Sequence, residues 1–195
     1  MRQLFTRGQS GITRIAGMCG MFIPVVIFTS LGVSIASSPW FTWTQHALSD
    51  LGIQENTAAL FNYGMIFGGI LALIFSFGLM KVLSKKLGAY VLALSSLALI
   101  GIGVFPETIF TLHFLTSASF FVLLAIALMI IGLTSRQNSF ERIMGLFALL
   151  LVVVSIGSTV FLFHFDGIAI SEALSCFPAF IWCQIVGIKM TRVQG

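Results

Sequence analysis

Residues 58–80 read AALFNYGMIFGGILALIFSFGLM, without a single charged side chain. As a helix, a run of this length crosses the roughly 30 Å of hydrocarbon in a lipid bilayer. The whole chain has the same character, because 58% of its 195 residues are hydrophobic and only 8% are charged, and its mean hydropathy is +1.07. This composition excludes a soluble globular domain and predicts an integral membrane protein.

Five further apolar segments of similar length flank this one. The six predicted spans are roughly 15–37, 58–80, 87–105, 110–133, 143–163 and 168–189. They fill most of the chain, so we expect residues 1–195 to form one all-α membrane domain, a six-helix bundle. The first span is too long for the apolar core of a cleaved signal peptide, and we therefore expect it to remain.

The basic residues fall on one side of this predicted topology. They precede the first span, follow the sixth, and occupy the second and fourth connections: Arg2, Arg7, Arg14, Lys81, Lys85, Lys86, Arg136, Arg142, Lys189 and Arg192. By the positive-inside rule, both termini of this multi-pass protein lie on the cytoplasmic side of the cell membrane. The net charge of +4 is then a topology signal with an affinity for anionic lipid. No pattern typical of nucleic-acid binding occurs.

Histidines and carboxylates gather in the opposite, outer connections. The outer set comprises all three histidines and every acid except Glu141: His46, Asp50, Glu55, Glu107, His113, His164, Asp166 and Glu172. Acids are free to lie where basic residues are excluded, which accounts for part of this sorting. It does not account for the histidines, so the outer half of the bundle is where we expect a site.

The first outer connection has the signals of a short surface helix at about 39–51. Ser38 suits an N-cap, Pro39 the first helical position, and Gly52 the residue after a helix end. At 100° per residue the aromatic and aliphatic side chains share one arc, and the polar residues, including His46, Ser49 and Asp50, share the other. The polar arc either faces water or covers the end of the bundle with a binding site.

Two candidates lie around the start of the fourth span. Glu107 follows Pro106, where a carboxylate is favoured by the helix dipole even without a ligand. His113 lies about 9 Å deeper by helical rise, and an ionisable group at that depth usually faces a polar cavity. Its alternative is a buried histidine bonded to a neighbouring hydroxyl. His164 and Asp166 belong either to a plain outer turn or to the same site.

Several chemistries are compatible with these residues in different degrees. A zinc site could use His46, Asp50, His113, His164 and Asp166, although an HExxH or HxxxH pattern is lacking. Haem is disfavoured because only His113 lies clearly inside a span. Ser49 has no surrounding nucleophile pattern. The cofactor, if any, is therefore unknown, with a divalent metal the one that these side chains suit.

The same residues resemble a known family. The resemblance rests on Ser49-Asp50-Leu51-Gly52 in the first outer connection, Phe61-Asn62, Gly101-x-Gly103-x-Phe105-Pro106 and His113. They resemble the six-helix membrane family catalogued as domain of unknown function 998, over most of the chain. The resemblance supports Ser49, Asp50, Gly52, Phe105, Pro106 and His113 and supplies no reaction. A more distant similarity is to the Frag1/DRAM/Sfk1 type, which implies a role in lipid remodelling.

Our leading hypothesis is a lipid-handling protein whose outer polar cluster binds a lipid headgroup or a metal. The predicted ligand-binding residues are His46, Ser49, Asp50, Glu107 and His113, and Asp50, Glu107 and His113 are also the catalytic candidates. The alternatives are a non-enzymatic structural or accessory protein, a membrane-embedded metal-dependent lipid hydrolase, and a small transporter. The expected partner is membrane lipid, and a homo-oligomer is left open.

Overall fold

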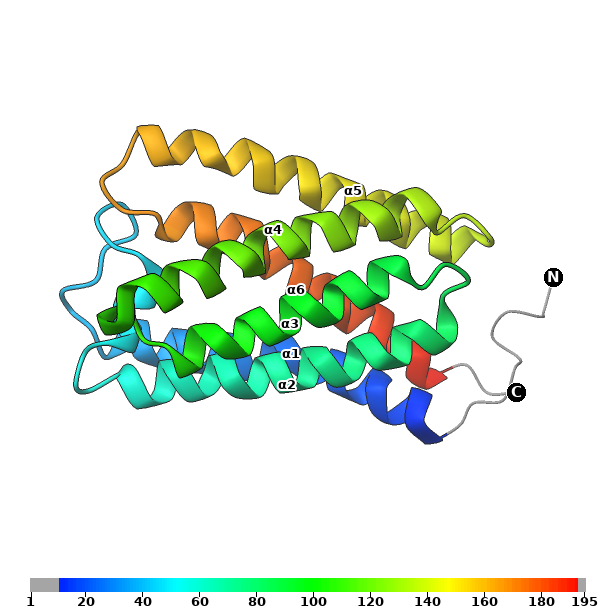
Figure 1. Ribbon diagram of the computed structural model, residues 1–195, viewed down its shortest axis with the longest axis horizontal. Helices are drawn as coiled ribbons and strands as arrows, with labels where there is room; N and C mark the ends of the chain where they lie inside the picture. The colour runs from blue at the N-terminus through cyan, green and yellow to red at the C-terminus, as the bar shows by residue number, and fades with distance from the viewer. Residues whose placement is uncertain (1–10, 193–195) are drawn as a thin grey trace.

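The computed structural model describes residues 11–192, and in this part of the chain the regular structure is entirely helical (Figure 1). Six long helices make up the bundle: α1 Gly11–Ala36, α2 Ala58–Val82, α3 Leu87–Val104, α4 Phe110–Thr134, α5 Ser139–Ser158 and α6 Ala169–Arg192. All six are long and apolar enough to cross a membrane. The predicted fold class, an all-α multi-pass membrane protein, is therefore confirmed.

The bundle is assembled mainly from helices that follow one another in the chain. α1, α2, α3 and α4 pack in sequence, α6 returns against α1, and α5 contacts α4 and α6 (Figure 1). The core between them is filled by large side chains such as Phe75 and Trp182, whose rings meet edge to face. Phe22, Phe67 and Val153 instead point outward from the helices, as expected of surfaces that face lipid.

Glycines set the closest helix contacts. Gly187 of α6 lies against Gly17 of α1, and a Cβ at position 187 would come 2.5 Å from the Gly17 carbonyl oxygen. Gly64 and Gly68 of α2 lie against Ser30 and Ile27 of α1. The GxxxG spacing in α2 thus serves packing within the chain, because small residues let two membrane helices approach closely.

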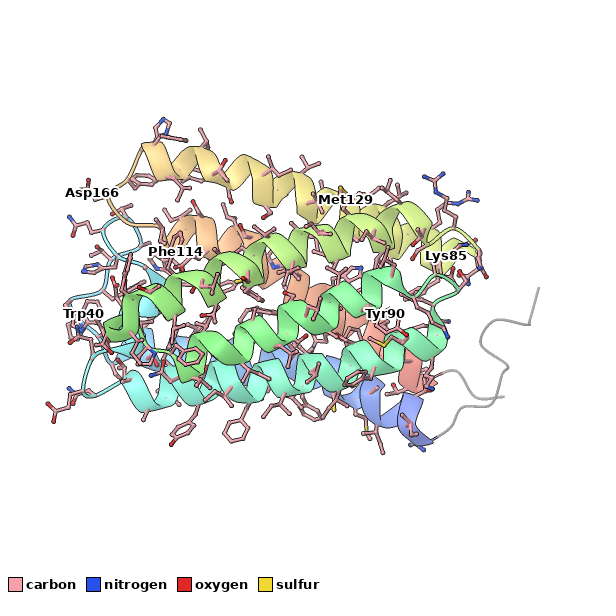
Figure 2. All side chains as sticks on the ribbon, viewed as in Figure 1. Trp40, Lys85, Tyr90, Phe114, Met129 and Asp166 are labelled. Atoms are coloured by element: carbon pink, nitrogen blue, oxygen red, sulfur yellow. The ribbon has the colours of Figure 1, made fainter. Side chains whose placement is uncertain are left out.

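The two ends of the bundle differ in charge. We call the end formed by segments 37–57, 105–109 and 159–168 the acidic end, and the end formed by 83–86 and 135–138 the basic end. Figure 2 shows Trp40 and Asp166 at the acidic end and Lys85 at the basic end. Arg2 and Arg7 lie outside the described residues. Among the residues that the structure describes, every arginine and lysine lies either in these two segments or in a terminal turn of a helix at the same end of the bundle.

The predicted surface helix at 39–51 is wrong. Residues 39–47 form turns, and only Leu48–Gly52 is helical, as the 3-10 helix η1. An isolated helix of about a dozen residues is marginal without tertiary support. Here a side chain takes the place of a helical backbone acceptor, since the Thr42 amide donates its hydrogen bond to His46 Nδ1 at 3.1 Å. Tertiary packing then draws Leu48 and Leu51 into the bundle.

The helix α5 begins a few residues earlier than the predicted span. The span was expected from about 143, yet the helix begins at Ser139 because Asn138 caps it, accepting from the Glu141 amide at 2.9 Å. The Glu141 carboxylate accepts in return from the Asn138 side-chain amide at 2.9 Å. The same carboxylate accepts from the Gln137 backbone amide at 3.2 Å, so Asn138 and Glu141 together fix the start of α5.

We predict that Gly187→Ala lowers the stability of the bundle by about 1–3 kcal/mol, because the added methyl group must push two tightly packed helices apart. Thermal unfolding in detergent, followed by circular dichroism, measures this loss. The matched control is Gly157→Ala in α5, where a Cβ meets nothing within 4 Å. Equal melting temperatures for the two variants would contradict close α1–α6 packing.

Candidate functional site at the acidic end

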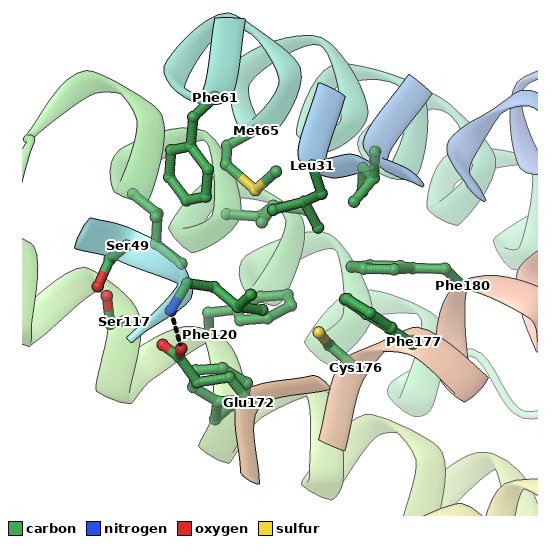
Figure 3. Close-up of a pocket in the computed structure, with 15 residues that line it drawn as sticks. Leu31, Ser49, Phe61, Met65, Ser117, Phe120, Glu172, Cys176, Phe177 and Phe180 are labelled. Atoms are coloured by element: carbon green, nitrogen blue, oxygen red, sulfur yellow. Dashed lines mark hydrogen bonds between the residues drawn. The ribbon is translucent and has the colours of Figure 1, made fainter. Parts of the chain in front are cut away.

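The centre of the acidic end is the short helix η1, which is inserted into the bundle. Its residues Leu48, Ser49, Leu51 and Gly52 are buried. Two carboxylates hold its first turn, since Asp50 accepts from the Ala47 amide at 3.0 Å and Glu172 of α6 accepts from the Leu48 amide at 2.6 Å (Figure 3). Amide donors left free at a helix start are therefore satisfied by acids.

The last turn of η1 is bound by side chains that follow it in the sequence. The Thr57 hydroxyl donates to the Leu51 carbonyl at 2.8 Å, and the Asn62 amide donates to the Gly52 carbonyl at 2.9 Å. Gly52 itself lies against Phe61 and Asn62, where a Cβ would come within 3 Å of both side chains. The motif Ser49-Asp50-Leu51-Gly52 is thus a buried, hydrogen-bonded element.

Three carboxyl groups from three separate segments lie in this region. The side chain of Glu107 is within hydrogen-bonding reach of the Asp50 carboxyl group, and Glu172 is close enough to both for their charges to interact. One carboxyl oxygen of Glu107 is buried without a hydrogen-bond partner. The structure therefore brings together the predicted residues Asp50 and Glu107. It adds Glu172, which the sequence placed among the outer carboxylates.

His113 lies at the edge of this cluster of acids and is held by hydrogen bonds at both ring nitrogens. It is 6% exposed, its Nδ1 lies 2.8 Å from the Phe105 carbonyl oxygen, and its Nε2 lies 3.3 Å from the Ser117 hydroxyl. The first bond ties the end of α3 to α4 across the Pro106 turn. This geometry is that of a structural tether, the alternative that the sequence left open, although His113 is still near enough to Glu107 for a charge interaction.

The predicted residues His46, His164 and Asp166 lie apart from this cluster of acids. His46 packs in an aromatic cluster, with ring centroids 5.0 Å from Trp40 and 5.8 Å from Phe41. Its backbone carbonyl accepts from the Ala169 amide, which joins the first and third connections at this end. His164 and Asp166 are exposed, and His164 Nδ1 lies 2.9 Å from the Val160 carbonyl.

Metal coordination finds no geometric support among residues 11–192. No three His, Cys, Asp or Glu side chains of this range lie together in an arrangement that could hold a metal ion. The predicted metal set of His46, Asp50, His113, His164 and Asp166 is spread over the acidic end because each histidine is engaged by its own segment. A zinc site needs about three such ligands at distances near 2 Å.

A small cavity lies directly below η1. It has a volume of about 40 Å³ and is lined by fifteen mostly apolar residues that include Ser49, Ser117, Glu172 and Cys176. Figure 3 shows the side chains of Ser49 and Ser117 directed toward each other, beside Glu172. A space of this size accommodates a few water molecules. The carboxylate of Glu172 thus lies between the buried amide of Leu48 and a small interior space.

Comparison with known proteins gives a family and no function. The profile of a family described as "Protein of unknown function (DUF998)" matches residues 20–189, so the chain belongs to this family. No curated protein and no solved structure matches the chain. The similarity to the Frag1/DRAM/Sfk1 type therefore stays a prediction.

We predict that His113→Leu destabilises the protein by about 1–3 kcal/mol, because the part-buried Phe105 carbonyl loses its donor. His164→Leu is the matched control: its Nδ1 also faces a backbone carbonyl, but the side chain is exposed, and we expect a change within about 0.5 kcal/mol. Chemical or thermal unfolding in detergent measures both. A His113 variant as stable as the wild type would contradict the tether.

Proposed function

We propose that this membrane protein of the DUF998 family handles lipid, binding a membrane lipid by its headgroup at the acidic end. The observation that carries the proposal is that Asp50, Glu107 and Glu172, from three separate segments, lie near enough for their charges to interact. Asp50 and Glu172 also cap η1, whereas Glu107 has a buried carboxyl oxygen without a hydrogen-bond partner, which a purely structural role does not require. The hypothesis of a lipid-binding site in this half of the bundle thus keeps Asp50 and Glu107 and gains Glu172.

Charge indicates which headgroup suits this group of acids. Ionised carboxyl groups this close repel each other, and a proton or a cation between them offsets that repulsion. Within residues 11–192, the acidic end has no arginine or lysine to supply the positive charge. A lipid amine, such as the primary ammonium group of an ethanolamine headgroup, supplies both the charge and hydrogen-bond donors.

The membrane orientation that we propose places this site at the outer leaflet. Every described basic residue lies at the other end of the bundle, and basic segments stay preferentially in the cytoplasm. The acidic end then faces outward in the cell membrane. Trp40 and Trp43, both partly exposed there, are at the level where tryptophan favours the headgroup region.

Binding is favoured over metal-dependent hydrolysis by the geometry of the histidines. His113 uses both ring nitrogens within the protein, and His46 and His164 are held by their own segments. The competing accessory role keeps one supporting observation, because Asp50 and Glu172 also hold the first turn of η1. An experiment on the function must therefore separate loss of ligand from loss of structure.

We predict that Asp50→Asn and Glu107→Gln each weaken binding of phosphatidylethanolamine about tenfold, because each removes one charge-assisted hydrogen bond to the ammonium group. Native mass spectrometry of the purified protein titrated with this lipid, with phosphatidylglycerol as the anionic comparison, measures the change. The Asn side chain can still accept from the Ala47 amide, so η1 keeps its cap.

Asp166→Asn is the control, since Asp166 is exposed at the same end and does not belong to the cluster of Asp50, Glu107 and Glu172. It should bind as the wild type does. Unchanged lipid binding in Asp50→Asn and Glu107→Gln, with a lowered melting temperature, would replace the proposal with the accessory role.

A further inference from the structure

A second, larger cavity opens on the side of the bundle. It has a volume of about 350 Å³ and lies between α4, α5 and α6, with Phe121, Val122 and Ala125 on one wall and Ser155 and Ile156 on another. This volume is within the range of small-molecule sites, about 300–1,000 Å³. We call this cavity the lateral crevice.

The lateral crevice exists because α5 separates from α4 toward the acidic end. In Figure 1 the two helices lie close at the basic end and diverge toward the other. Near the basic end, Gly132 of α4 lies against Gly145 of α5, and a Cβ at position 132 would come 2.8 Å from the Gly145 carbonyl oxygen. Close packing at one end and divergence at the other leave a crevice on the membrane-facing side.

The walls of the lateral crevice suit an alkyl chain. Most of its lining is apolar, although several serines contribute to it. Three of these four serines use their hydroxyl groups within the protein: Ser171 donates to the Ser158 carbonyl at 2.8 Å, and Ser158 donates to the Ser155 carbonyl at 2.7 Å and lies 3.2 Å from the Ser175 hydroxyl. The contacts of Ser158 with Ser171 and Ser175 fasten α5 to α6, and together these bonds leave few polar groups for a ligand.

Glu172 connects this crevice with the cluster of acids at the acidic end. It lines both the lateral crevice and the cavity below η1, and its charge interacts with Asp50 and Glu107. A molecule in the crevice therefore has an apolar channel along most of its length and a carboxylate at one end. That combination matches an amphiphile with an alkyl chain and a cationic head.

We propose that the lateral crevice holds one acyl chain of an amine-headed membrane lipid, which enters sideways from the hydrocarbon between α4 and α5. The inference rests on the proposed headgroup site and adds the entry route and the second half of the ligand. The occupant is a lipid chain because the crevice opens between helices that cross the membrane, where alkyl chains are the surrounding solvent. The cavity volume suits one chain and not a whole two-chain lipid.

The experiment uses the full-length protein in nanodiscs that contain phosphatidylethanolamine with a diazirine in one acyl chain. After irradiation, peptide mass spectrometry maps the labelled residues. We expect labels at Phe121, Val122, Ala125 and Ile156. Ala125→Trp and Ser155→Phe, which fill the crevice from two different helices, should each lower that labelling at least fivefold. Val153→Trp is the control, because Val153 is 65% exposed on α5 and does not line the crevice.

Different outcomes separate this inference from the proposed function. Equal labelling of the crevice and of outward residues such as Val153, unchanged by the filling variants, would overturn the crevice as a chain site even if Asp50→Asn still weakens headgroup binding. A free fatty acid with the same diazirine chain is the further comparison. Crevice labelling that favours the amine lipid supports the joint assignment. Equal labelling by the fatty acid keeps the chain site and removes the headgroup preference.

Discussion

In hydrocarbon, a backbone amide or carbonyl without a partner costs several kcal/mol, and this constraint governs the whole molecule. The six spans satisfy it by being helical throughout. The connection at 37–57 enters the bundle without a long helix, so its polar groups need partners from elsewhere. The carboxylates of Asp50 and Glu172 accept hydrogen bonds from backbone amides at the start of η1. The side chains of Thr57 and Asn62 donate to the carbonyls at its end.

This arrangement places ionisable groups where a purely structural solution would not require them. Amides at a helix start can be satisfied by serine, threonine or asparagine as well as by acids. The acidic end instead uses carboxylates and adds Glu107, one oxygen of which is buried without a partner. An acidic cluster that lacks a nearby basic residue is the feature from which we propose a cationic lipid headgroup as the ligand.

The packing of α5 links this cluster to the membrane. Close contact between Gly132 and Gly145 fixes α5 against α4 near the basic end, while Ser158, Ser171 and Ser175 fasten it to α6 at the other end. Between these attachments the helices stand apart, and the lateral crevice results. The same acid, Glu172, accepts a hydrogen bond from η1 and lines the crevice, so one residue connects the acidic end with the lateral crevice.

The sequence by itself determined the class, the number of spans and the separation of charge, because hydrophobicity over about twenty residues is a local property that no tertiary contact reverses. Asp50 and Glu107 were also identifiable as site candidates. Tertiary structure alone decided the rest. It replaced the expected helix at 39–51 with turns and a buried 3-10 segment, gave His113 a backbone partner and kept the histidines apart. It also brought Glu172 to Asp50 from the far end of the chain. The Leu48–Glu172 bond that holds η1 spans 124 residues, and the histidines are held by hydrogen bonds within their own segments; helical periodicity contains no information about either kind of contact.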